Sequence, residues 1–86
     1  MKKCAYWNSV FALVVVNSYE KGTLTFKNMR EWETKYNGGF YSATLGTREI
    51  LEHYISLSDA GREKKRNSVA EFLANNENFR EHFDKN

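Results

Sequence analysis

The stretch VFALVVV, residues 10–16, is the longest apolar run in this chain of 86 residues. Four of its seven residues are valine, whose branched Cβ favours the extended backbone of a strand. Both alternating faces of the run are apolar, as in a strand that is covered on each side. The run is also too short to span a bilayer. We therefore predict that residues 10–16 form the central strand of a sheet.

Two further segments complete the predicted sheet. Residues 17–22, NSYEKG, are rich in turn formers, and residues 23–26, TLTF, alternate polar and apolar side chains as a half-buried strand does. We expect the first two strands to form a β-hairpin. A third strand is predicted at residues 40–45, between Gly39 and Gly46, where a right-handed crossover would make it parallel to the second strand.

A short helix is predicted between the second and third strands. Asn28 and Glu31 have the spacing of a capping box, so the helix should begin there. Residues 37–39, Asn-Gly-Gly, should end it because Asn and Gly accept the left-handed conformation. Apolar residues at helical spacing form its inner face: Met29, Trp32 and Tyr36.

The C-terminal half of the chain has helical signals only. Residues 47–57 have a strong apolar stripe behind a capping Thr, and Ser58 is predicted to begin another helix. Residues 75–76, Asn-Asn, should end that helix. Phe79 and Phe83 lie four apart and predict a final helical turn.

The predicted fold is α+β, in the order ββαβ followed by two or three helices. A small mixed sheet, made of the N-terminal hairpin and the third strand, would pack with two to four short helices. No linker, repeat or low-complexity segment divides the chain, so we expect one compact domain over residues 1–86. The predicted core residues are Phe11, Leu13, Val14, Val15, Leu24, Ile50, Leu51, Tyr54, Phe72 and Leu73.

The composition favours a binding protein of the cytoplasm. The net charge of +2, from 13 basic and 11 acidic residues, lacks the strong basic excess of a typical nucleic-acid binder. The single cysteine, Cys4, cannot close an intrachain disulfide, which fits a reducing compartment. Two Trp, five Tyr and six Phe are more aromatic residues than one small core readily hides, and exposed Tyr and Trp often anchor interfaces.

No residue pattern predicts catalysis, a cofactor or a metal site. Glu49 and His53 lie four apart on a predicted helix, but no third group is placed by sequence, so a surface contact is the favoured interpretation. His82 lies between two Phe side chains, and Cys4 has no neighbouring base. The chain has no Cys-x-x-Cys pair, nucleophile elbow or phosphate-binding glycine loop. We therefore expect no enzymatic activity.

The first candidate surface is aromatic and predicts protein binding. Three aromatic side chains surround the glycine pair at 38–39, and rigid rings supply contact area at low entropic cost. The predicted interface residues are Trp32, Tyr36, Phe40 and Tyr41. In this hypothesis the chain occupies the surface of a larger protein or ribonucleoprotein complex and thereby inhibits or regulates it, as a phage or mobile-element accessory protein does. A membrane partner is not expected, and a homodimer stays open.

The second candidate surface is the dense charge run at residues 62–66, REKKR. A cluster of cations on a helix can contact phosphates, although such runs are most often solvated faces. The predicted phosphate-binding residues are Arg62, Lys64, Lys65 and Arg66. The alternative hypothesis is therefore a small nucleic-acid-binding protein that uses this basic helix.

Overall fold

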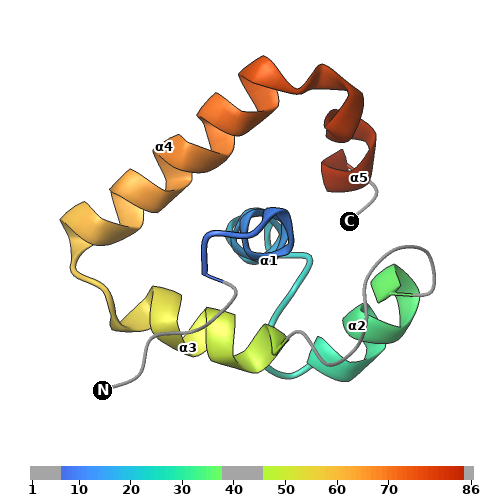
Figure 1. Ribbon diagram of the computed structural model, residues 1–86. Helices are drawn as coiled ribbons and strands as arrows, with labels where there is room; N and C mark the ends of the chain where they lie inside the picture. Colours follow the sequence, from blue (N-terminus) through green and yellow to red (C-terminus); the bar gives the residue numbers. More distant parts are fainter. Residues whose placement is uncertain (1–6, 38–45, 85–86) are drawn as a thin grey trace.

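The computed structural model describes residues 7–37 and 46–84, and the regular elements within these two ranges are all helical (Figure 1). They are α1 (Val10–Lys21), α2 (Met29–Asn37), α3 (Thr47–Ser56), α4 (Asp59–Asn75), the 3-10 helix η2 (Glu77–Phe79) and α5 (Arg80–Asp84). The predicted α+β fold is wrong, because the described residues form a small all-helical fold without a sheet. The predicted third strand at residues 40–45 lies outside the described residues.

Helix α1 lies at the centre of the fold, and Figure 1 views it along its axis with the other helices around it. It packs against α3, α4 and α5, and the ring of Phe11 lies 6.3 Å from that of Trp32 on α2. Residues 11–16 are all buried. Because neighbouring side chains on a helix are about 100° apart, six in succession cover its whole circumference. The predicted central strand is therefore a helix that is apolar on every side because it is enclosed on every side.

Both ends of α1 carry local signals for a helix. Ser9 is the N-cap, and its Oγ accepts a hydrogen bond from a backbone N–H of the first turn at 3.1 Å. At the other end Gly22 has a φ of 85°. The Gly22 N–H donates to the Tyr19 carbonyl and the Thr23 N–H donates to the Ser18 carbonyl, which is the hydrogen-bond pattern of a Schellman motif.

The predicted hairpin is replaced by a helix end and a connecting loop. Residues 17–21 form the last turns of α1 instead of a β-turn, and residues 23–26 form no strand. Leu24 is fully buried in the core and the half-buried Phe26 packs against it, so two apolar side chains hold the loop to the domain. The alternation in TLTF reflects these two inward-facing residues and not the pleat of a sheet.

Helix α2 begins where the sequence predicts, but its cap differs. The Asn28 N–H donates to Thr25 Oγ1 at 3.1 Å, and the Thr25 N–H donates to Asn28 Oδ1 at 2.7 Å. This reciprocal pair has the geometry of a capping box. It forms one turn earlier than the predicted pair of Asn28 and Glu31, because the Asn28 side chain points back along the chain.

The helices of the C-terminal half match their predicted positions closely. Helix α3 ends one residue before the predicted Leu57, and Ser58 caps α4 by accepting a hydrogen bond from the Gly61 N–H at 3.2 Å. Helix α4 ends at Asn75, as predicted. The predicted Thr cap of α3 is wrong, because Gly46 stands at the N-cap without a side-chain hydrogen bond and Thr47 is the first, buried residue of the helix. The start of α4 follows from its local cap, and the positions of both helices follow from helical periodicity, which acts over a few residues.

Most of the predicted core is confirmed. Eight of the ten residues are buried, whereas Phe72 and Leu73 are half-buried. The Phe72 ring packs edge to face on Phe79 at 5.4 Å and lies 6.0 Å from the ring of Phe83, which is fully buried. The predicted C-terminal turn thus closes the core beside α4 and α1.

Replacing Gly22 with Ala should lower the free energy of unfolding by about 1–2 kcal/mol, since a Cβ disfavours the left-handed backbone. No atom lies within 4 Å of where that Cβ would stand, so the loss reports the backbone alone. Gly22→Asn should lose less, because Asn tolerates this conformation better. Urea unfolding followed by circular dichroism measures both. An Ala variant as stable as the wild type would contradict the left-handed cap.

Candidate functional site

The four predicted phosphate-binding residues all lie in the first half of α4, but their side chains contact different parts of the fold. Arg62, Lys65 and Arg66 each make hydrogen bonds within the domain. Lys64 is exposed, and the structure shows no hydrogen bond or ion pair of its ammonium to a described residue. Three of the four cations thus join parts of the fold.

Arg62 closes the corner between α3 and α4. Its Nη1 donates to the carbonyl of Leu57 at 2.6 Å and to that of Ile55 at 3.4 Å, and its Nη2 pairs with the carboxylate of Asp59. The carbonyls at the end of a helix lack partners within that helix and carry partial negative charge. Arg62 therefore stabilises the end of α3 from the first turns of α4.

Arg66 belongs to a polar cluster that connects α1, α3 and α4. The Tyr54 hydroxyl donates to Glu20 Oε2 at 2.5 Å and accepts from Arg66 Nη1 at 3.0 Å. Arg66 Nη1 also lies 3.7 Å from Glu20 Oε2. Burial, and then the hydrogen bond to Glu20, raise the pKa of the Tyr54 phenol above its usual value. The cluster thus provides hydrogen-bond partners for the hydroxyl of Tyr54, a residue that is fully buried.

Lys65 is the most unusual of the four cations. Its residue is only 7% exposed, and its Nζ donates to the carbonyl of Trp7 at 2.7 Å. The same Nζ lies 4.2 Å from the centre of the Trp7 ring, within the range of a cation–π contact. Desolvation by burial lowers the pKa of the Lys65 ammonium. Among the described residues, no carboxylate pairs with this ammonium.

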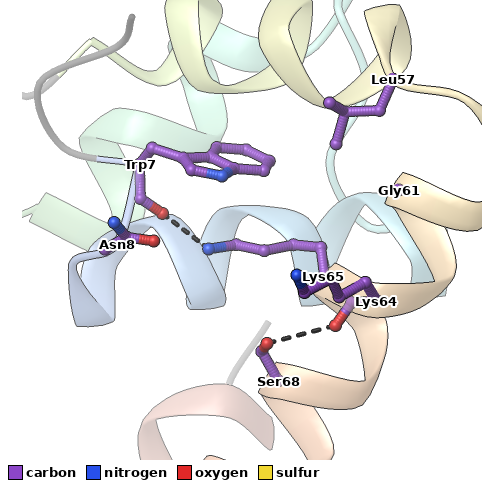
Figure 2. Close-up of a pocket in the computed structure, with 7 residues that line it drawn as sticks. All are labelled: Trp7, Asn8, Leu57, Gly61, Lys64, Lys65 and Ser68. Carbon is purple, nitrogen blue, oxygen red and sulfur yellow. Dashed lines mark hydrogen bonds between the residues drawn. The ribbon is translucent and has the colours of Figure 1, made fainter.

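Trp7 and Lys65 line a surface pocket of about 290 Å³, shown in Figure 2. The pocket lies between three parts of the chain: Trp7 and Asn8 before α1, Leu57 at the end of α3, and Gly61, Lys64, Lys65 and Ser68 on α4. In Figure 2 the Lys65 side chain runs beneath the indole of Trp7, with its ammonium directed at the Trp7 carbonyl. The pocket therefore combines an aromatic face, an apolar wall and a largely buried cation.

Ser68 and Lys65, two polar groups of this pocket, do not form a nucleophile and base pair. Ser68 and Lys65 lie three apart on α4, a spacing at which a lysine can activate a serine. However, the Ser68 hydroxyl donates to the Lys64 carbonyl at 3.1 Å, while Lys65 donates to Trp7. The hydrogen bonds of the two groups lead in different directions, so neither prepares the other for proton transfer.

The structure places one residue of the predicted aromatic interface inside the core. Trp32 is 5% exposed and packs towards Phe11. Tyr36 lies in the last turn of α2, but its side chain, like the whole of Phe40 and Tyr41, lies outside the described residues. An interface around residues 36–41 stays a prediction.

His53 contacts the pocket from α3. Its half-buried ring packs edge to face against Trp7, with the ring centres 4.3 Å apart, whereas Glu49 is exposed one turn earlier. Cys4 and the side chain of His82 lie outside the described residues. Within the residues that the structure does describe, no three His, Cys, Asp or Glu side chains gather to hold a metal ion.

Sequence analysis did not single out Trp7, although the pocket depends on it. Trp7 and Lys65 are 58 positions apart, and no local periodicity relates them. The only local signal for Trp7 is its position two residues before Ser9, the N-cap of α1. That position does not predict which helix the indole ring packs on. Only the packing of α1 against α4 brings the two residues together.

Tyr54→Phe should lower the free energy of unfolding by about 1–2 kcal/mol near pH 7, because Glu20 and Arg66 lose a shared partner. The raised pKa means that Tyr54 contributes stability below its ordinary value of 10.0, and this contribution is lost as pH rises through the folded-state pKa. The difference between wild type and Tyr54→Phe should therefore shrink above pH 10. Urea unfolding between pH 7 and pH 11 measures it, and a constant difference would contradict the cluster.

Lys65→Met should show the opposite dependence on pH. The lowered pKa means that the unfolded chain holds this proton more tightly, so the cost of burying the ammonium falls as pH rises towards the ordinary value of 10.5. The stability of the wild type relative to Lys65→Met should therefore rise with pH in the window below 10.5. Unfolding curves of both proteins over that window measure it. A pH-independent difference would show that the ammonium is not desolvated.

Known proteins were compared with this chain in three ways. No protein-family model, no curated protein and no solved structure matches it. We therefore infer function from the chemistry of the pocket.

Proposed function

We propose that this chain is a small non-enzymatic protein-binding module whose contact surface is centred on the pocket beside Trp7. The single observation that carries the proposal is the placement of a half-buried tryptophan over a largely buried lysine at the mouth of a pocket of about 290 Å³. In this role the chain regulates or inhibits a larger protein or ribonucleoprotein complex by occupying part of its surface.

The make-up of the pocket supports a protein partner. Interface hot spots are enriched in Trp and lie where a few polar groups surround a partly apolar pocket. Here Trp7 and Leu57 supply apolar area, while Asn8, Lys64 and Ser68 supply polar groups at the rim. Ile55, in the last turn of α3, is a further exposed apolar side chain, with 44% of its surface exposed.

The contacts of the basic residues favour protein binding over nucleic-acid binding. Phosphate recognition along a helix needs several cations that are free to turn towards the ligand. Arg62 and Arg66, whose guanidinium groups suit phosphate best, instead hold α3 and the Tyr54 cluster. Arg66 and Lys64 are both exposed, but of the predicted four only Lys64 has no hydrogen bond or ion pair to a described residue.

The cytoplasm is the compartment that we propose, since the single cysteine of the chain fits a reducing setting. Among the helices of the described residues, none combines the length and the apolar character needed to cross a bilayer.

Trp7→Ala should abolish binding of the partner protein, whereas Phe26→Ala should leave that binding unchanged. Phe26 is a matched control because it is also a half-buried aromatic residue, but it stacks with Arg48 at the opposite end of α3. Tagged wild type and both variants are used to capture proteins from a lysate of the source organism, with quantitative mass spectrometry. For a partner found this way, calorimetry should show that Trp7→Ala loses about 2 kcal/mol or more of binding free energy.

Two results would contradict this proposal. The first is a partner that binds Trp7→Ala and the wild type equally well while both variants remain folded by circular dichroism. The second is submicromolar binding of DNA or RNA at physiological salt that Lys64→Glu abolishes and Trp7→Ala leaves unchanged, which would support the nucleic-acid alternative.

A further inference from the structure

Lys65 is a largely buried residue whose ammonium has no negative partner among the described residues. Removing a cation from water costs free energy unless an opposite charge compensates it. The Trp7 carbonyl and the face of its indole offset part of this cost, but neither carries a net charge. Lys65 can donate three hydrogen bonds, and the carbonyl of Trp7 accepts one of them.

This cation borders a pocket that is open to solvent. Lys64 lines the same pocket and is exposed, so a second ammonium is available at the rim. Figure 2 shows Leu57 and Gly61 on the side of the pocket formed by the corner between α3 and α4. A ligand that fits this lining has a negative end for the lysines and a short apolar stem for Leu57 and the indole.

From this lining we infer that the pocket receives the side-chain carboxylate of an Asp or Glu residue in the partner protein, with Lys65 as its principal counter-ion and Lys64 at the rim. The inference rests on the proposed function and specifies the chemistry of the partner segment. The carboxylate oxygens accept hydrogen bonds from the two ammonium groups, and the methylene carbons of the same side chain lie against Trp7 and Leu57.

Several features favour a carboxylate over a phosphate. The pocket contains ammonium groups but no guanidinium, because Arg62 and Arg66 are engaged outside it. Phosphate sites commonly add backbone N–H donors at the start of a helix. At the start of α4 the Gly61 N–H already donates to Ser58 Oγ. A carboxylate, with one negative charge, matches the single buried cation better than a phosphate dianion does.

The volume of the pocket also limits the ligand. The volume of about 290 Å³ lies just below the range for small-molecule sites, which begins at roughly 300 Å³. It suits one side chain of a bound peptide, and the remainder of the partner then contacts the surrounding surface. The affinity of the full partner would therefore exceed that of an isolated acidic side chain by a wide margin.

The test uses two probes that differ only in charge, N-acetyl-glutamate amide and N-acetyl-glutamine amide. Each is titrated into the ¹⁵N-labelled full chain while the indole N–H of Trp7 and the backbone N–H groups of Gly61, Lys65 and Ser68 are followed by NMR. Trp7→Phe assigns the indole signal of Trp7 against that of Trp32. The glutamate probe should shift these signals and bind at least about tenfold more tightly than the glutamine probe, because the latter forms no ion pair.

A lysine variant provides the second measurement. Lys65→Met keeps a long apolar side chain beneath the indole but removes the charge, so the preference for glutamate over glutamine should disappear. Lys35→Met is the control, since Lys35 is exposed on α2 and does not line the pocket. If Lys65→Met fails to fold, the comparison of the two probes on the wild type still decides the inference.

Three outcomes would contradict the assignment of a carboxylate ligand to this pocket. They are equal binding of the two probes, no shift of the Trp7 indole at probe concentrations of tens of millimolar, and tighter binding of O-phosphoserine than of the glutamate probe at the same signals. If a partner protein binds in a Trp7-dependent way but competes with neither probe, the carboxylate site is contradicted and the proposed binding module is still supported. If the glutamate probe binds through Lys65 but no protein binds in a Trp7-dependent way, the carboxylate site is supported and the proposed binding module is contradicted.

Discussion

The complete enclosure of α1 is the constraint on which the rest of the structure depends. A helix whose residues 11–16 are buried on every side cannot be stable alone in water, because its apolar surface needs a cover in each direction. Helices α3, α4 and α5 supply that cover together with Trp32 of α2. Leu24, from the connection between α1 and α2, adds a fully buried side chain to the same core.

The enclosure of α1 also explains why the basic run of α4 is only partly available to a ligand. Helix α4 crosses α1 and borders α3, so cations spaced along its first turns meet groups that need a donor. Arg62 meets the carbonyls at the end of α3, Arg66 meets the hydroxyl of Tyr54, and Lys65 meets the carbonyl of Trp7. Their hydrogen bonds hold the helices in register. Of these three cations, Lys65 alone has no charged partner among the described residues, and it lies beside the pocket. Structural and recognition roles are therefore divided among neighbouring residues of one helix.

The candidate site was predictable only in part. The sequence analysis selected Lys64 and Lys65 because a dense charge run stands out in any sequence. It did not select Trp7, and it assigned Lys65 to a solvated or phosphate-binding face, because burial of a lysine is not visible in a local pattern. The aromatic surplus did not separate the two roles, because aromatic residues serve cores as readily as interfaces, and Trp32 serves the core.

Features that act over one or two helical turns were visible in the sequence. The start of α4 follows from its capping Ser58, the positions of α2 and α3 follow from apolar periodicity, and most of the core residues follow from their apolar character. Residues 10–16 lack such a period, because a run that is apolar at every position fits both a strand covered on two faces and a helix covered all round. The local caps at Ser9 and Gly22 favour the helix, and the helices packed around the segment supply the cover that a helix apolar on every side requires. The same packing placed Trp7 over Lys65, since a contact across 58 positions depends on the path of the whole chain and not on any local preference.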